Sequence, residues 1–135
     1  DSERTKLWIF TAERGMRLGH WPEMARALER AERFSPSRRV LLERALAETK
    51  QGRWGEARAA YQRLIERSPQ DPVAWFGVAG ASLRLGDTLT AGKAERWLLE
   101  HVAGEDAARE VTRYWRFLPE MYPAAVRTPA ESPGR

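Results

Sequence analysis

The sequence predicts an all-α solenoid, a stack of helical hairpins, and three observations support this fold class. A pattern of bulky, small and glycine positions returns every 33 to 34 residues, and a period of this size is typical of stacked supersecondary units. Within each copy the apolar residues recur at helical spacing. Glycine and proline punctuate the copies where helices begin and end. Stacks of this kind are in general binding surfaces, so the repeat also bears on function.

The three copies of the pattern align without internal gaps. The first copy contains Trp8, Ala12, Gly19, Trp21, Met24, Leu28, Ala31 and Pro36; the second contains Leu41, Ala45, Gly52, Trp54, Ala57, Tyr61, Leu64 and Pro69; the third contains Trp75, Ala79, Gly86, Thr88, Ala91, Glu95 and Leu98.

Each copy predicts two helices joined by a tight turn. Gly19 is expected to take the left-handed conformation that ends many helices, and Pro22 suits the first turn of the next one. Asp71 is expected to cap the fifth helix, with Pro72 at its first position. The predicted helices span 5–18, 22–33, 38–51, 54–67, 72–85 and 88–102, which gives repeats at about 5–37, 38–71 and 72–103.

A seventh helix is predicted over residues 105–118, where Val111, Tyr114, Trp115 and Leu118 share one face. A terminal helix that covers the last repeat and presents a polar back to water suits the end of a solenoid. The domain is therefore expected to span 1–118. Residues 119–135 are rich in proline and are expected to be extended or disordered.

The aligned residues resemble the tetratricopeptide repeat (TPR). The run from Gly52 to Ala57 is the strongest match, while Met24, Glu95 and a missing third proline depart from the family pattern. The resemblance implies three TPR units plus a C-terminal capping helix, in a right-handed superhelical stack. It also implies that the first helix of each unit lines a concave groove, in which a peptide or helix of a partner protein binds, and that the chain is a scaffold or adaptor and not an enzyme.

The resemblance further implies which residues face that groove. Arg17, Lys50 and Arg84 are equivalent and would form a ladder of positive charge, which suits an acidic or amphipathic segment. The alternative is that basic residues at helix C-termini only complement the helix macrodipole. The expected partner-binding residues are Lys6, Ile9, Met16, Arg17, Arg39, Leu42, Leu46, Lys50, Phe76, Gly80, Leu83 and Arg84, of which Ile9, Leu42 and Phe76 form an apolar row.

Two glycines, Gly77 and Gly80, interrupt the fifth helix, and each disfavours it by roughly 1 kcal/mol relative to alanine. Either a neighbouring helix packs closely there, or the groove floor opens beside Phe76 for a partner side chain; close packing is favoured. Trp97 and Trp115 have no place in the repeat pattern and could form a contact patch for a partner or a second copy.

The composition allows a second hypothesis. The net charge is +4 and the isoelectric point about 9.9, with 20 Arg and only 3 Lys. Because a basic surface with six Trp can attract and stack nucleic acid, a nucleic-acid-binding helical repeat is the alternative. The repeat argues against it, since four of the Trp occupy packing positions. The Glu and Arg residues at helical spacing, such as Glu43, Arg44 and Glu48, are interpreted as solvated ion-pair faces.

No active site is predicted. There is no Cys, no phosphate-binding glycine loop and no ligand set around His20 or His101, so no cofactor, metal or small-molecule substrate is expected. There is no Asn, which argues against the carboxylate clamp of some chaperone-binding TPR domains. The mean hydropathy of −0.63 argues against a membrane protein. A bacterial cytoplasmic or periplasmic setting within an envelope, secretion or biogenesis complex is the working hypothesis, with membrane attachment only through an anchor outside this chain.

Overall fold

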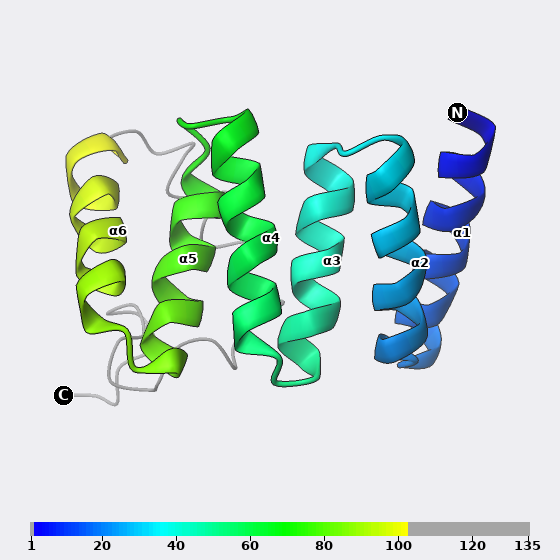
Figure 1. Cartoon of the computed structure of the whole chain (residues 1–135), viewed down its shortest axis with the longest axis horizontal. Helices are drawn as coiled ribbons and strands as arrows, with labels where there is room; N and C mark the ends of the chain where they lie inside the picture. The colour runs from blue at the N-terminus through cyan, green and yellow to red at the C-terminus, as the bar shows by residue number, and fades with distance from the viewer. Residues whose placement is uncertain (1, 103–135) are drawn as a thin grey trace, which may run out of the picture.

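The computed structural model describes residues 2–102, and these residues form helices and connecting turns without a strand. The helices lie side by side in a row, with α1 at one end and α6 at the other (Figure 1). The all-α solenoid of helical hairpins predicted from the period is confirmed. The predicted capping helix and tail lie outside the described residues. The six helices of the described part are α1 (Ser2–Leu18), α2 (Trp21–Phe34), α3 (Arg38–Lys50), α4 (Trp54–Arg67), α5 (Pro72–Leu85) and α6 (Thr88–His101).

The turn inside each helical hairpin is built on a glycine. Gly19, Gly52 and Gly86 have φ angles of 73°, 72° and 77°, and they are the positive-φ residues of the described chain. Side chains disfavour this region, and glycine enters it without steric penalty. The left-handed conformation predicted for Gly19 is confirmed, and Gly52 and Gly86, which were expected at turns, adopt it as well.

Side-chain caps begin the helices that open a new unit. Ser37 accepts a hydrogen bond from the backbone N–H of Val40 at 3.2 Å, and Asp71 accepts one from Val73 at 3.0 Å. The buried Asp71 carboxylate also accepts a hydrogen bond from Arg38 Nε at 2.7 Å. The predicted cap at Asp71 is confirmed, and its ion pair additionally ties the start of α5 to the start of α3.

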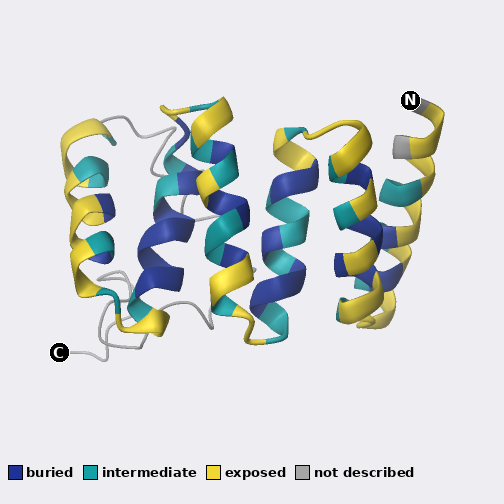
Figure 2. Cartoon of the chain, viewed as in Figure 1, coloured by how far each residue is buried: buried dark blue, intermediate teal, exposed yellow. Residues whose placement is uncertain are grey.

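The core lies between consecutive helices. Each of the six helices packs against its neighbours in the chain, and buried residues are most frequent in α2 to α5 (Figure 2). Alanine supplies much of this core, which allows the helices to approach closely, and Leu28 and Tyr61 are the large residues at equivalent positions. Leu46 packs against the buried clusters on both sides of it, so the core is continuous through α3.

Gly77 of α5 packs closely against α4. A Cβ built on Gly77 would lie 2.4 Å from Cδ1 and from Cε1 of the Tyr61 ring in α4, and Tyr61 is fully buried. Even an alanine methyl therefore has no room. Close packing, the favoured explanation for the glycine at this position, is confirmed.

Aromatic stacking joins the fifth and sixth helices. The rings of Trp75 and Trp97 stack with centroids 4.8 Å apart, and Trp97 stacks in turn on His101 at 4.4 Å. The indole N–H of Trp75 donates to the carbonyl of Pro69 at 2.8 Å. Trp97, which the repeat pattern did not place, thus contacts α5 and the end of its own helix. Trp115 lies outside the described residues.

Candidate functional site

The candidate binding surface consists of the twelve residues predicted to bind a partner, all of which lie on α1, α3 and α5. Because these helices have similar lengths and follow the same period, equivalent residues occupy the same turn of each helix. Their exposure differs from unit to unit. Lys6, Arg17, Arg39 and Arg84 are exposed; Ile9, Met16, Leu42, Leu46, Lys50 and Leu83 are half-buried; Phe76 and Gly80 are buried.

Two members of the basic ladder pack over tryptophan rings. Lys50 Nζ lies 6.0 Å from the ring centroid of Trp21, and the Arg84 guanidinium lies 5.2 Å from that of Trp54. In both cases a cation in the last turn of the first helix of one unit covers the tryptophan that begins the second helix of the preceding unit. An exposed cation–π contact contributes about 0.5–1 kcal/mol. These side chains therefore have a structural role between units, whichever ligand they attract.

The apolar row is open in two units and closed in the third. Ile9 and Leu42 are half-buried, and each packs beside a buried cluster. Phe76 is only 5% exposed and belongs to the buried cluster formed with Tyr61 and Ala45. The accessible apolar surface among the predicted residues therefore lies on α1 and α3, and Phe76 and Gly80 are core residues in this structure.

The exposed basic residues near the start of the first helices already contact carboxylates. Arg39 forms ion pairs with Glu13 of α1 and with Glu43, the latter at 3.4 Å. Lys6 lies 3.6 Å from Glu3, with both side chains largely exposed. Arg39 thereby links α3 to α1, and a partner carboxylate at this position would compete with Glu13 and Glu43.

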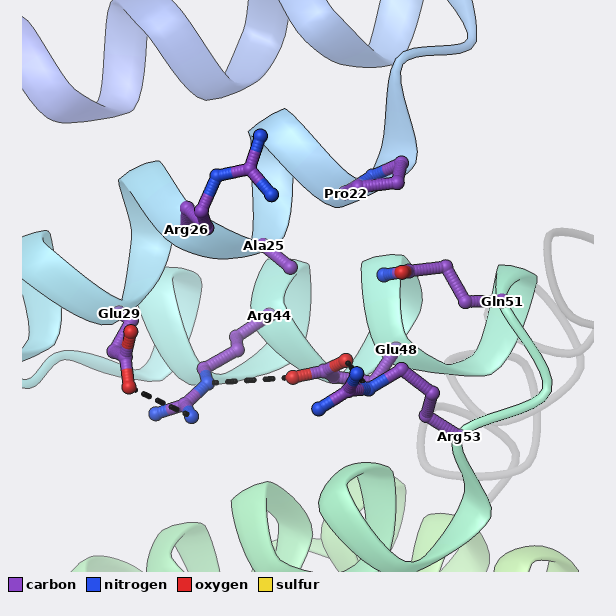
Figure 3. A pocket seen from close by; sticks show the side chains of 8 residues that line it. All are labelled: Pro22, Ala25, Arg26, Glu29, Arg44, Glu48, Gln51 and Arg53. Carbon is purple, nitrogen blue, oxygen red and sulfur yellow. Dashed lines mark ion pairs between the residues drawn. The ribbon is translucent and has the colours of Figure 1, made fainter.

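A pocket of about 130 Å³ opens between α2, α3 and the start of α4 (Figure 3). Arg44 Nη2 lies 3.8 Å from Glu29, and its Nε lies 3.9 Å from Glu48. Arg53 Nε lies 3.0 Å from Glu48 Oε1, without hydrogen-bond geometry. Since Arg44 and Arg53 of the lining already pair with Glu29 and Glu48, we interpret the pocket as part of a structural ion-pair network.

The same network extends to Glu32 of α2. Glu32 Oε1 accepts a hydrogen bond from Arg44 Nη1 at 2.6 Å, and its Oε2 accepts one from Arg63 Nε at 2.5 Å. One carboxylate of α2 therefore holds an arginine from α3 and another from α4. Alignment of the repeats could have indicated this site, because Arg44 occupies the position of the buried Val78.

The interpretation of Glu43, Arg44 and Glu48 as a solvated ion-pair face is wrong. The Glu48 side chain is 6% exposed, and those of Arg44 and Glu43 are 17% and 18% exposed. Burial raises the pKa of the Glu48 carboxyl despite the neighbouring arginines, and burial likewise raises that of Glu43 against the opposing effect of Arg39. The reason is the position of α3, which is covered by α2 on one side and α4 on the other.

Two further properties of the described residues bear on function. Within residues 2–102 no three His, Cys, Asp or Glu side chains gather in a way that could hold a metal ion. No helix in this described part has the length and apolar character needed to cross a membrane.

The comparison with known families agrees with the repeat geometry. The family model described as tetratricopeptide repeat matches residues 14–72 and 42–108, which together exceed half of the chain. No curated protein sequence matches the chain. The matched residues include the helices α2 to α6 in full and the end of α1, together with the turn glycines described above. This chain belongs to the tetratricopeptide repeat family, whose members in general act as protein–protein interaction modules.

Proposed function

We propose that the chain is a noncatalytic scaffold that binds an acidic, amphipathic segment of a partner protein against α1 and α3. The observation that carries the proposal is the pairing of half-buried apolar side chains, Ile9 and Leu42, with exposed cations, Arg17 and Arg39, on successive first helices. Apolar anchors supply most of the affinity of such contacts, and complementary charge supplies specificity and association rate. Membership of a protein-binding repeat family supports this assignment.

The proposal differs in one respect from the row expected on sequence grounds. Because Phe76 and Gly80 are buried, the anchors are assigned to Ile9, Met16, Leu42 and Leu46. The bound segment also reaches the C-terminal end of α5, where Arg84 provides positive charge as Arg17 does at the end of α1. The setting in a bacterial envelope, secretion or biogenesis complex stays a prediction.

Selection from a displayed library of helical peptides tests the partner chemistry. The library should contain acidic, neutral and basic amphipathic helices of matched hydrophobicity. We expect acidic sequences to be enriched, with affinities then measured by fluorescence anisotropy. Equal enrichment of the three classes would refute the role assigned to the basic residues.

A matched pair of charge variants locates the surface. Arg17→Glu with Arg84→Glu should weaken peptide binding at least tenfold. Arg67→Glu with Arg96→Glu makes the same change in net charge at exposed positions on α4 and α6, and it should leave binding within about threefold of the parent chain. Equal losses in both variants would mean that the peptide follows overall charge and not the proposed surface.

A matched pair of apolar variants tests the anchors. Ile9→Ala should weaken binding by more than about 1 kcal/mol, or roughly fivefold. Leu89→Ala removes an apolar side chain that is 69% exposed on α6, and it should have no effect. Melting midpoints recorded for both variants separate lost contacts from lost folding.

Measurement of RNA binding tests the nucleic-acid alternative. One face of several tryptophan rings is already covered from within the chain: Trp8 by Arg30, Trp21 by Lys50 and Trp54 by Arg84. Binding of a single-stranded RNA oligonucleotide that falls steeply with salt, together with no peptide enrichment, would replace the scaffold proposal.

A further inference from the structure

The outer face of α1 is an unusual stripe for the end of a helical stack. Leu7 and Phe10 are 57% and 59% exposed, and they lie between Glu3 and Arg14 at spacings of four, three and four residues. That spacing places all four side chains on one side of the helix. The outer edge of α1 is correspondingly exposed at the end of the row (Figure 2).

The equivalent positions of the second and third units are covered by a neighbouring helix. On α3 and α5 most of the equivalent residues pack against the second helix of the preceding unit. Val40 and Ala47 share a buried cluster with residues of α2, and Ala74 and Ala81 share clusters with residues of α4. On α1 the same positions carry larger apolar side chains and have no such neighbour in the described chain. The equivalents of Leu7, Phe10 and Arg14 are Val40, Glu43 and Ala47 on α3, and Ala74, Gly77 and Ala81 on α5.

We propose that this face binds the same face of a second copy, with the two α1 helices antiparallel about a two-fold axis. In this arrangement Leu7 packs against Phe10 of the second copy, and Glu3 lies opposite Arg14 of the second copy. Along α1 the stripe consists of one acidic, two apolar and one basic residue. In an antiparallel pair the acidic residue of each copy therefore lies opposite the basic residue of the other, and the apolar residues lie opposite one another. A parallel pairing would instead place Glu3 beside Glu3 and Arg14 beside Arg14.

The charged ends of the stripe are available for this pairing. Arg14 is exposed and takes part in no hydrogen bond or ion pair with the described residues, and Glu3 makes one exposed contact, with Lys6 at 3.6 Å. Opposed helix macrodipoles favour the antiparallel arrangement as well. A closed two-fold contact uses one patch on both copies, and it therefore stops at the dimer.

The size of the stripe indicates a weak dimer. Two apolar layers with charged ends fall at the low end of interface sizes, and such contacts are reversible, with dissociation constants on the order of micromolar. Dimerisation through α1 leaves the far end of the stack untouched. The stripe and the residues assigned to peptide binding are different residues of α1, so separate variants test the two proposals.

Sedimentation equilibrium on the whole 135-residue chain, over a hundredfold range of loading concentration, measures the association. We expect a monomer–dimer equilibrium that Phe10→Lys weakens at least tenfold. Leu89→Lys, which adds the same charge at an exposed leucine of α6, should leave it unchanged. Far-UV circular dichroism and melting midpoints establish that each variant is folded.

Charge exchange tests the antiparallel register. Glu3→Arg and Arg14→Glu should each weaken the dimer several-fold, because each brings like charges together. The double variant restores both pairs in reverse and should return the dissociation constant to within about twofold of the parent value. A parallel dimer would show no such rescue.

Three outcomes would overturn the proposal. The first is a monomer at every concentration. The second is association that Phe10→Lys leaves intact while Trp115→Ala abolishes it, which would assign self-association to the segment 105–118. The third is a double charge variant no tighter than its parents. Loss of peptide binding in the Arg17 and Arg84 variants would be unaffected by any of these results.

Discussion

Replacing Gly77 by alanine should destabilise the protein, although alanine is the better helix former. Gly77 lies inside α5, and the alanine side chain taken alone would favour the helix by about 1 kcal/mol. The added Cβ would however lie 2.4 Å from two ring carbons of Tyr61, where carbon atoms prefer separations of about 3.5–4.0 Å. Tyr61 is fully buried, so its ring cannot withdraw into solvent.

The two effects differ enough in size to fix the sign. Overpacking a core typically costs about 1–3 kcal/mol, and an overlap of about 1 Å with an immobile ring belongs at the upper end of that range. After subtraction of the helix-propensity gain, Gly77→Ala should lose about 2 kcal/mol of unfolding free energy. For a chain of this size that loss corresponds to a melting midpoint lower by about 6–10 °C.

Urea unfolding followed by far-UV circular dichroism measures the change directly. Gly92→Ala is the matched control, because Gly92 lies inside α6 and a Cβ there meets nothing within 4 Å. It should raise stability by about 0.5–1 kcal/mol. In a Tyr61→Leu background the penalty of Gly77→Ala should shrink markedly. If Gly77→Ala stabilised the chain as Gly92→Ala does, the close contact between α4 and α5 would be refuted.

Three further perturbations can be followed by the same unfolding measurement. Asp71→Ala should lose about 1–2 kcal/mol, since it leaves the N–H of Val73 without its cap, whereas Asp71→Asn should lose less; equal losses would contradict the capping role. Thr49→Val should gain about 1 kcal/mol, because the buried Thr49 hydroxyl has no hydrogen-bond partner among residues 2–102, and a loss would show that the hydroxyl is satisfied. Burial raises the pKa of Glu48 in the folded state above its ordinary value of 4.5, so the folded state holds the carboxyl proton more tightly than the unfolded state does. The free energy of unfolding of the parent chain therefore falls as pH rises from 4.5 to the folded-state pKa. Glu48→Gln should therefore gain stability relative to the parent as pH rises from 4.5 toward neutral, and a difference independent of pH would refute the shift.

The sequence was sufficient for the helices and their order. Gly52 and Gly86 mark turns because a positive φ is a local requirement that glycine meets and other residues avoid. Asp71 marks a helix start because capping depends on residues two positions away. The two glycines in the fifth helix indicated close packing by a neighbouring helix, and the structure identifies Tyr61 of α4 as the neighbour of Gly77.

The candidate site was less predictable, because exposure depends on what covers each residue. Leu42 and Phe76 are equivalent in sequence, yet one is half-buried and the other belongs to the core. Lys50 is a basic residue at a helix end in the sequence, and only packing between units places it over Trp21. Neither difference follows from the local pattern.

The one-dimensional pattern of glycine, proline and apolar residues determined the secondary structure, the repeat and the family of this chain, because turns, caps and helical faces depend on residues a few positions apart. Only the tertiary structure decided which charges are buried and which faces remain open. Glu32, Arg44 and Arg63 come from three different helices, and their ion pairs exist because stacking brings those helices together. The stripe around Phe10 stays exposed for the complementary reason: it lies at the end of the stack, where the described chain supplies no further helix to cover it.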